Sequence, residues 1–245
     1  MKLYYHDSRM TPLVDKYLVK DYVASIVGDS YVIPTLGHWE SFDEIDFDKL
    51  PEKFVLKTNH DSGGVVICKE KASFDKLAAK KKLEKSLVHN FYTYSKEWPY
   101  KNVKRCIIAE KFMEDPGNPD LKDYKWFCFD GVPKALFVAS DRHVDEVETK
   151  FDFFDDNFNH LPFTHGHPNS TLPIEKPENF DEMKKLAAKL SSGFPHVRID
   201  LYDINGKIYF GEMTFFHHGG FVAFNPTQWD YKFGSWINLP DKRIG

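Results

Sequence analysis

Two runs of strand-forming residues flank a short glycine loop in KFVLKTNHDSGGVVI, residues 53–67. This pattern predicts a hairpin. A P-loop is also glycine-rich, but it ends in Gly-Lys-Ser/Thr, and here the loop leads into a second strand. Lys57 ends the first strand, and backbone N–H groups of Ser62, Gly63 and Gly64 could close over phosphates above it. The same pattern also fits a plain turn beside a surface lysine, so both interpretations stay open at this point.

Helix and strand patterns alternate along the rest of the chain. Apolar residues at helical spacing predict a helix over residues 11–28, a long helix from Ser73 to about Tyr94, and a third helix over residues 179–190. Strands are expected at 103–113, in the pair 124–140 joined by the turn Asp130-Gly131, and in the pair 197–213. Residues 141–176 show no clear period and are expected to form a long functional loop or an insertion.

Composition limits the classes of partner. The 245 residues are 42% hydrophobic, enough for a sizeable core in one large domain or in two coupled lobes. The net charge of −4 and the pI near 6.3 argue against a nucleic-acid or anionic-membrane partner, because such partners favour a basic surface. The lysine run at 80–82 is expected to be a solvated helix face.

The cysteines and the chain's first residues indicate a compartment. Cys68, Cys106 and Cys128 are far apart and form no CxxC pair, which predicts buried thiols in a reducing compartment rather than disulfides or a zinc site. No apolar stretch reaches the roughly 18 residues of a membrane span. The first ten residues, MKLYYHDSRM, lack the apolar region of a signal peptide. We therefore expect a cytoplasmic protein without a membrane span.

Four segments occur in a fixed order: TPLVDKYLVKDYV, LPEKFVLKTNHDSGG, KWFCFDG and VRIDLYDINGKIYFGEMTF. In this order they resemble the ATP-grasp superfamily and, more narrowly, its TupA-like branch, which is found in surface-polysaccharide loci. The resemblance implies an α+β fold in which two α+β lobes with antiparallel sheets grip ATP between them. It further implies one ATP-grasp domain over 1–245, with a smaller lobe at 51–113, a larger lobe at 114–245, and a helix–strand segment at 1–50 that packs on them. The N-terminal domain that precedes this fold in many relatives is expected to be absent or truncated.

The resemblance also implies which residues bind the nucleotide. Lys16 and Lys57 would contact the phosphates, and the loop containing His60, Ser62, Gly63 and Gly64 would close over them. The hinge that binds adenine through backbone groups and apolar side chains would consist of Glu110, Lys111, Phe112 and Met113. Asp123 would occupy the position of an acidic residue that binds the ribose.

A metal site and an acceptor loop follow from the same resemblance. Asp200 and Glu212 would hold Mg²⁺, which prefers oxygen ligands; taken alone, they would be two solvated strand carboxylates. Thr214, a poorer ligand, stands where relatives often have asparagine. Arg198 would stabilise the acyl phosphate. The loop that faces the acceptor would consist of His217, His218, Gly219 and Gly220, although packing is an equal alternative for the two histidines.

Two further histidines lie in THGHP, at 165 and 167. Their alternation is that of a metal pair, but no acidic or thiol residue lies at a matching spacing. We expect them on the surface or in a substrate loop.

The implied activity is an ADP-forming carboxylate–amine ligase that uses ATP and Mg²⁺. By resemblance, the carboxylate would belong to a uronic acid of a bacterial surface polysaccharide and the amine to an amino acid. A sugar or small-molecule kinase is the alternative, because the same grip on ATP can serve phosphoryl transfer to a hydroxyl. A non-catalytic nucleotide- or glycan-binding module is a third class. The sequence leaves a homo-oligomer open.

The shared metal site requires a particular register in the terminal hairpin, because side chains alternate faces along a strand. A two-residue loop at Asn205-Gly206 would pair Ile204 with Lys207 and place the two carboxylates on opposite faces. A three-residue loop with Gly206 in the left-handed position would instead pair Asp203 with Lys207. We therefore expect the three-residue loop. One face would then carry Arg198, Asp200 and Glu212, and the other Ile199, Leu201, Tyr209 and Met213.

Overall fold

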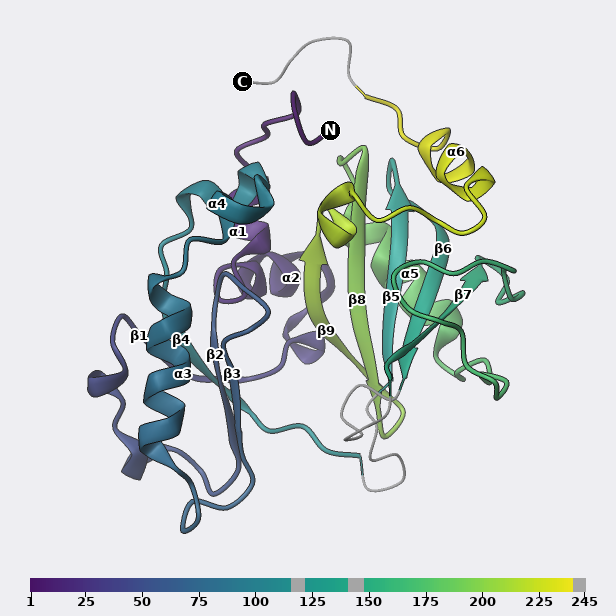
Figure 1. Ribbon diagram of the computed structural model, residues 1–245. Helices are drawn as coiled ribbons and strands as arrows, with labels where there is room; N and C mark the ends of the chain where they lie inside the picture. The colour runs from purple at the N-terminus through teal and green to yellow at the C-terminus, as the bar shows by residue number, and fades with distance from the viewer. Residues whose placement is uncertain (116–121, 141–147, 240–245) are drawn as a thin grey trace.

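The computed structural model describes residues 1–115, 122–140 and 148–239. Its named strands form two antiparallel sheets (Figure 1). The four-stranded sheet has the order β1-β4-β2-β3, with β1 at Thr35–Trp39, β2 at Phe54–Thr58, β3 at Val65–Cys68 and β4 at Ile107–Lys111. The five-stranded sheet has the order β7-β6-β5-β8-β9, with β5 at Asp123–Phe129, β6 at Val132–Ser140, β7 at Lys150–Asp155, β8 at His196–Ile204 and β9 at Lys207–Thr214. The expected α+β fold with two antiparallel sheets is confirmed.

One face of the four-stranded sheet is covered by α3 (Lys76–Val88), which lies along it in Figure 1. Phe54 and Leu56 of β2 are buried on this face and pack with Leu83 of α3. Because side chains alternate along a strand, Lys57 points to the opposite face. The helix therefore covers the apolar side of the hairpin and leaves the lysine side for other contacts.

One face of the five-stranded sheet is covered by α5 (Phe180–Ser191), behind the strands in Figure 1. The helices α1 (Met10–Val14) and α2 (Val19–Val27) join this core, which contains Trp126, Ile199 and Met213. The opposite face of β5 and β8 carries buried charged residues, Lys125 and Asp200 among them. Charges buried on a sheet are paired or functional, so this face is the candidate site.

Several element predictions need correction. The single helix expected over 11–28 is two helices, because the backbone of Asp15 is extended between α1 and α2. Asp75 rather than Ser73 caps α3, which ends at Val88 and is followed by a separate helix, α4 (Phe91–Ser95). The expected long loop contains β7, paired with β6, while residues 141–147 lie outside the described part. The helix α6 (Gln228–Gly234) was not predicted.

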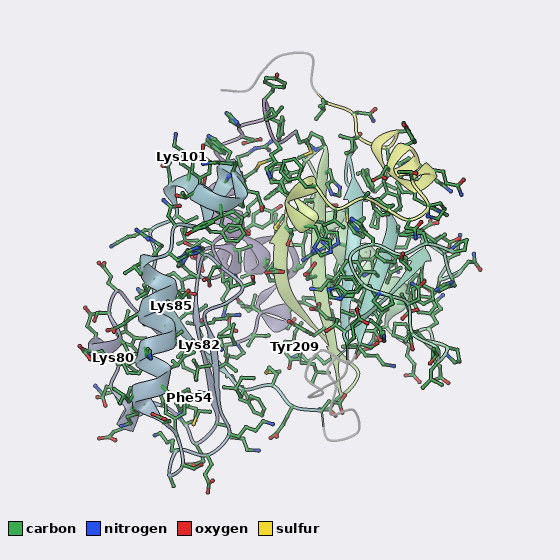
Figure 2. All side chains as sticks on the ribbon, in the orientation of Figure 1. Phe54, Lys80, Lys82, Lys85, Lys101 and Tyr209 are labelled. Atoms are coloured by element: carbon green, nitrogen blue, oxygen red, sulfur yellow. The ribbon has the colours of Figure 1, made fainter. Side chains whose placement is uncertain are left out.

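The predictions for the cysteines and for the lysine run are confirmed. The three cysteines are buried and free of disulfides. Figure 2 shows Lys80, Lys82 and Lys85 along α3; residues 81 and 82 are exposed, and Lys80 pairs with Asp43 at 2.6 Å. Within the described ranges, no helix combines the length and apolar character needed to cross a membrane.

The predicted loop of the terminal hairpin is wrong. Ile204 pairs with Lys207, and φ is 53° at Asn205 and 72° at Gly206, so the turn has two residues. Asn-Gly favours this turn because both of its central positions require positive φ. Gly206 has the predicted positive φ, but as the second residue of the shorter loop.

A bulge at Gly211 nevertheless restores the shared face. Leu201 pairs with Phe210, whereas Asp200 pairs with Glu212, so Gly211 is the extra residue on β9. Its backbone passes so close to β8 that an added Cβ would lie 3.2 Å from the carbonyl oxygen of Asp200. The two carboxylates therefore lie on one face, as predicted, by a different route. Tyr209 pairs with Tyr202 and leaves the predicted apolar set, in which Phe210 takes its place.

Candidate active site

The carboxylate of Glu110 is paired with two lysines on the face of the four-stranded sheet that α3 does not cover. Its Oε2 lies 2.6 Å from Nζ of Lys57 and its Oε1 lies 2.6 Å from Nζ of Lys20. Burial raises the pKa of Glu110, but the two ammonium groups outweigh burial, and the net pKa is lowered. Lys20 was not predicted, although it follows Lys16 by four residues, a spacing that brings side chains together on a helical turn.

Lys16 ties the start of α2 to the glycine hairpin. Its backbone N–H donates to the carbonyl of Asn59 at 2.9 Å, and its Nζ donates to the carbonyl of Asp61 at 2.5 Å. Burial lowers the pKa of Lys16, and the carboxylates of Glu212, Asp61 and Glu110 act in the opposite direction. The carboxylates that act to raise the pKa of Lys16 therefore come from both sheets, Glu212 from β9 and Glu110 from β4.

Asp15 has a structural part in the same junction. Its Oδ1 accepts from the backbone N–H of Tyr17 at 2.8 Å and so fixes the turn that leads into α2. Its Oδ2 accepts from Nδ2 of Asn59 at 2.8 Å. The Asp-Lys pair thus fixes α2 to the β2–β3 loop through both of its residues.

An aspartate inside the glycine loop organises its shape. Asp61 accepts from the hydroxyls of Thr58 and Ser86, each at 2.5 Å, and from the N–H of Gly64 at 3.2 Å. A side chain at Gly64 would not fit, since a Cβ would lie 2.2 Å from Oγ1 of Thr58. The loop is therefore closed by its own network, and the N–H of Gly64 is already used.

The other predicted loop residues differ in exposure. His60 is buried, and its Nε2 lies 3.0 Å from the carbonyl oxygen of His89, which holds the loop to the segment after α3. Ser62 and Gly63 are exposed at the tip. Among the predicted loop residues, Ser62 and Gly63 are thus the exposed pair, and their contact with phosphates stays a prediction.

The predicted hinge residues lie at the end of β4. Lys111 is exposed, and its backbone N–H donates to the carbonyl of Pro34 at 3.0 Å. Phe112 and Met113 follow the strand and are half-buried. The side chain of Glu110 is engaged by lysines, so an adenine contact there would have to come from its backbone. The adenine role of all four residues stays a prediction.

Arg198 joins the predicted metal ligands on the five-stranded sheet. Its Nε and Nη2 donate to the two oxygens of Asp200, each at 2.7 Å. Nη2 also donates to Oε1 of Glu212 at 3.1 Å and to Oγ1 of Thr214 at 3.0 Å. Burial lowers the pKa of Arg198, but the carboxylates of Asp200 and Glu212 outweigh it and raise the pKa.

These contacts test whether the residues suit a cation. Oxygen atoms of Asp200, Glu212 and Thr214 surround one nitrogen of Arg198, so they converge on a single point that already attracts positive charge. Carboxylate and hydroxyl oxygens are the ligand type that Mg²⁺ prefers. The donor set fits magnesium, on condition that Nη2 of Arg198 yields its place.

Lys125 completes the buried charge cluster and was not predicted. Its Nζ contacts Oδ2 of Asp123 at 2.6 Å and also contacts Oδ2 of Asp200, which lies opposite it across β5 and β8. A lysine within the aromatic strand KWFCF was the available signal. Asp123 is buried beside this lysine, and its role at the ribose stays a prediction.

The predicted acceptor loop follows β9 directly. Its residues form a short turn, His217–Gly220, in which His218, Gly219 and Gly220 have positive φ. Nη1 of Arg198 donates to Nδ1 of His217 at 2.5 Å. Nζ of Lys2 donates to the carbonyl of Gly219 at 2.7 Å. The loop is thus linked to the charge cluster at one end and to the N-terminal segment at the other.

Glu97 lies beside this loop, with its Oε1 3.9 Å from a Cβ placed on Gly219, and Tyr100 follows in the next turn of the chain; neither was predicted. Burial raises the pKa of Glu97 to about 7, against the charges of Lys2 and Arg198. Burial and the carboxylates of Glu212 and Glu97 raise the pKa of Tyr100 well above its usual value. Charged residues of the candidate site therefore shift the pKa of both groups. Titratable groups with strongly shifted pKa values cluster at functional sites.

Of the two alternatives for the histidines of THGHP, the surface position is excluded for His165, and the substrate loop stays a prediction. His165 is buried rather than on the surface. Its ring centroid lies 5.0 Å from that of His217 and 5.1 Å from that of His218. The loop that contains His165 therefore packs against the predicted acceptor loop.

The family model described as TupA-like ATPgrasp matches residues 1–238. The chain belongs to the TupA-like ATP-grasp family. The match covers both sheets and every predicted site residue, so the motif order was a sound guide to the family. A search of the curated proteins finds no match.

Solved structures share this fold at low identity. D-alanine–D-alanine ligase from Bacillus anthracis is 20% identical with a TM-score of 0.51, over 96% of this chain and 69% of that chain. The ATP-grasp ligase PsnB, complexed with a phosphomimetic variant of its minimal precursor, Mg and ADP, is 9% identical with a TM-score of 0.50, over 97% of this chain and 58% of that chain. The chain covers 54% of the B. anthracis ligase solved with ATP. These likenesses establish the ATP-grasp fold of the TupA-like chain.

Proposed function

We propose that this TupA-like protein is an ATP-dependent, ADP-forming carboxylate–amine ligase. The observation that carries the proposal is the position of Lys16 between residues of the two sheets. Its Nζ donates a hydrogen bond to the glycine loop of one sheet, and the carboxylate of Glu212 on the other sheet acts to raise its pKa against the effect of burial. ATP bound between the sheets would meet cations from one lobe and a carboxylate cluster from the other.

The residues of the small sheet would bind the nucleotide. Lys57 and Lys20 now neutralise Glu110, and phosphate oxygens would compete with that carboxylate for their ammonium groups. The exposed tip at Ser62 and Gly63 would close over the phosphates with its backbone N–H groups. Adenine would lie at the hinge, residues 110–113, and the ribose near Asp123.

The residues of the large sheet would hold the transferring group. Asp200 and Glu212, with Thr214, would hold Mg²⁺, which neutralises charge on phosphate oxygens when bound. Arg198, released in part from these oxygens, would bind the acyl phosphate. A fixed cation at that position stabilises the negative charge that develops during transfer.

The reaction has two steps. A carboxylate oxygen of the first substrate attacks the γ-phosphorus of ATP, and the bond to the β,γ-bridging oxygen breaks, giving an acyl phosphate and ADP. The amine nitrogen of the second substrate then attacks the acyl carbon, phosphate leaves, and the nitrogen loses a proton to give the amide. Lys16, Lys57 and Arg198 would offset the charge in the first step, and the 217–220 loop would face the amine.

We further propose a uronic acid of a surface polysaccharide as the carboxylate and an amino acid as the amine. The support is the motif resemblance and the family membership. A cytoplasmic location fits a consumer of ATP and is proposed with the same support.

The test is product analysis. The protein is incubated with ATP, Mg²⁺, uronic-acid nucleotide sugars or glycan fragments, and pooled amino acids, with Glu212→Gln as the inactive control. We expect ADP and an amide product, and, when hydroxylamine replaces the amino acids, a hydroxamate formed by attack of hydroxylamine on the acyl phosphate. A stable phosphoester would indicate the kinase, AMP would indicate another class, and Mg²⁺-independent ATP binding without turnover would indicate a binding module.

A further inference from the structure

Three histidines from two distant segments meet beside the acceptor loop. His165 comes from the loop at 164–168, while His217 and His218 come from the turn after β9. Ring nitrogens of the three lie within 4.8 Å of one another. Backbone bonds between Thr164 and Asn225, 2.9 Å in both directions, hold the first loop against the chain that follows the second. The cluster is therefore fixed by the fold rather than formed by neighbours in sequence.

The orientation of His165 is that of a metal ligand. Its Nε2 lies 2.9 Å from the carbonyl oxygen of Val222, so Nε2 carries the hydrogen and donates it. Nδ1 then bears the lone pair, and this atom is buried without a hydrogen-bond partner. An imidazole that donates one N–H to a carbonyl and presents its other nitrogen is the usual arrangement around a bound metal.

Burial favours the neutral form of all three rings. Burial lowers the pKa of His165. Burial and the charge of Arg198 lower that of His217 well below its usual value, and burial with the neighbouring His165 lowers that of His218 to about 4. Only neutral imidazole offers a lone pair to a metal. No net proton has to leave the cluster before a cation binds.

We propose that His165, His217 and His218 bind one divalent transition-metal ion of the zinc class. Imidazole nitrogen suits Zn²⁺, Co²⁺ and Ni²⁺, whereas Mg²⁺ prefers the oxygens of Asp200 and Glu212, so the two sites select different ions. Three histidine ligands leave a fourth tetrahedral position for water or a substrate oxygen. The ion would join the 164–168 loop to the acceptor loop.

Arg198 couples this site to the candidate active site. Its Nη1 donates to Nδ1 of His217, so Nε2 of that ring, which is buried without a partner, carries the hydrogen. A metal bound at Nε2 of His217 requires this proton to move to Nδ1. Nδ1 would then be a hydrogen-bond donor that faces another donor, Nη1 of Arg198. The contact with Nη1 must then break, while Nε and Nη2 keep their bonds to Asp200. Metal binding would therefore free one Arg198 nitrogen. The histidine site does not depend on the proposed ligase activity, so the metal would bind whether or not the protein is a ligase.

The test uses Co²⁺ as a visible probe. The full chain is stripped with a chelator, placed in excess Mg²⁺ to occupy oxygen sites, and titrated with Co²⁺. Four-coordinate, nitrogen-ligated Co²⁺ absorbs strongly in the visible range, and six-coordinate, oxygen-ligated Co²⁺ absorbs weakly. We expect the strong bands to saturate at one Co²⁺ per chain and to disappear on addition of Zn²⁺.

Variants locate the site. His165→Ala and His218→Ala should each weaken Co²⁺ binding by more than about 100-fold. The matched control is His167→Ala, which removes a ring from the same loop but outside the cluster and should keep the bands. His218 retains partial access to solvent, so its removal decides the test if the His165 variant does not fold by circular dichroism. Weak bands in the unsubstituted protein, or strong bands that persist in the His218 variant, would overturn the site.

Discussion

Glu97 is the group through which pH should act most clearly on stability. It is 5% exposed, and burial, which the charges of Lys2 and Arg198 and a hydrogen bond from Ser95 offset only in part, raises its pKa from 4.5 to about 7. The folded protein therefore binds the Glu97 proton more tightly than the unfolded chain does. The contribution of Glu97 to the free energy of unfolding should therefore be most favourable below pH 4.5, fall as pH rises to about 7, and change no further above that.

The size of the effect follows from the shift. Each pKa unit corresponds to about 1.4 kcal/mol, so the shift at Glu97 costs at most about 3–4 kcal/mol once the carboxylate is ionised. Glutamine has nearly the same shape and no proton to lose. Glu97→Gln should therefore raise the free energy of unfolding by about 1–3 kcal/mol near pH 8 and leave it nearly unchanged near pH 4.5.

Urea unfolding of both proteins across this pH range measures the difference, and taking the difference removes the titration of every other group. Glu175→Gln is the matched control, because Glu175 is exposed and such a change should alter stability by less than about 0.5 kcal/mol. If the Glu97 variant is equally stable or less stable than the unsubstituted protein near pH 8, the carboxylate is not destabilised by burial.

Three further substitutions probe the two sheets. Lys57→Met should reduce ATP turnover by orders of magnitude and, because Glu110 loses one of its two ammonium partners, lower the unfolding free energy by about 1–3 kcal/mol; turnover and urea unfolding measure both, and full activity would contradict the phosphate role. Glu212→Gln should abolish ADP release and change the melting temperature by no more than a few degrees; retained turnover would show that Glu212 is not a metal ligand. Gly64→Ala should cost about 1–3 kcal/mol, since its Cβ would lie 2.2 Å from Oγ1 of Thr58, and a neutral result by urea unfolding would mean that the loop relaxes freely.

Much of the fold was predictable because local signals agreed with the motif order. The β2–β3 hairpin, the turn at Asp130-Gly131 and α5 each combine a clear period with a clear turn or end. The terminal hairpin is the instructive failure. A shared metal ion requires Asp200 and Glu212 on one face of the hairpin, and the prediction attributed this arrangement to a three-residue turn. The bulge at Gly211 produces it instead, and a glycine inside a strand was the signal for that bulge.

The candidate site was only partly predictable, because much of it is assembled by tertiary packing. Lys125 reaches Asp200 only because β5 and β8 are neighbours, although they are far apart in the chain. His165 meets His217 across 52 residues of sequence. Burial, which determines the behaviour of Glu97, has no local sequence pattern. Motif order therefore found the residues whose roles the family pattern specifies, and missed residues such as Lys125 and His165, whose contacts depend on sheet order and on loop packing.

The most direct measurement of the central claim is a crystal structure of the protein with a nonhydrolysable ATP analogue and Mg²⁺. We predict the triphosphate between Lys16, Lys57 and the loop tip at Ser62, with the metal on Asp200 and Glu212. Nη2 of Arg198 should have left its present position among the ligand oxygens. A nucleotide bound elsewhere, or a metal that contacts neither carboxylate, would contradict the proposed ligase site.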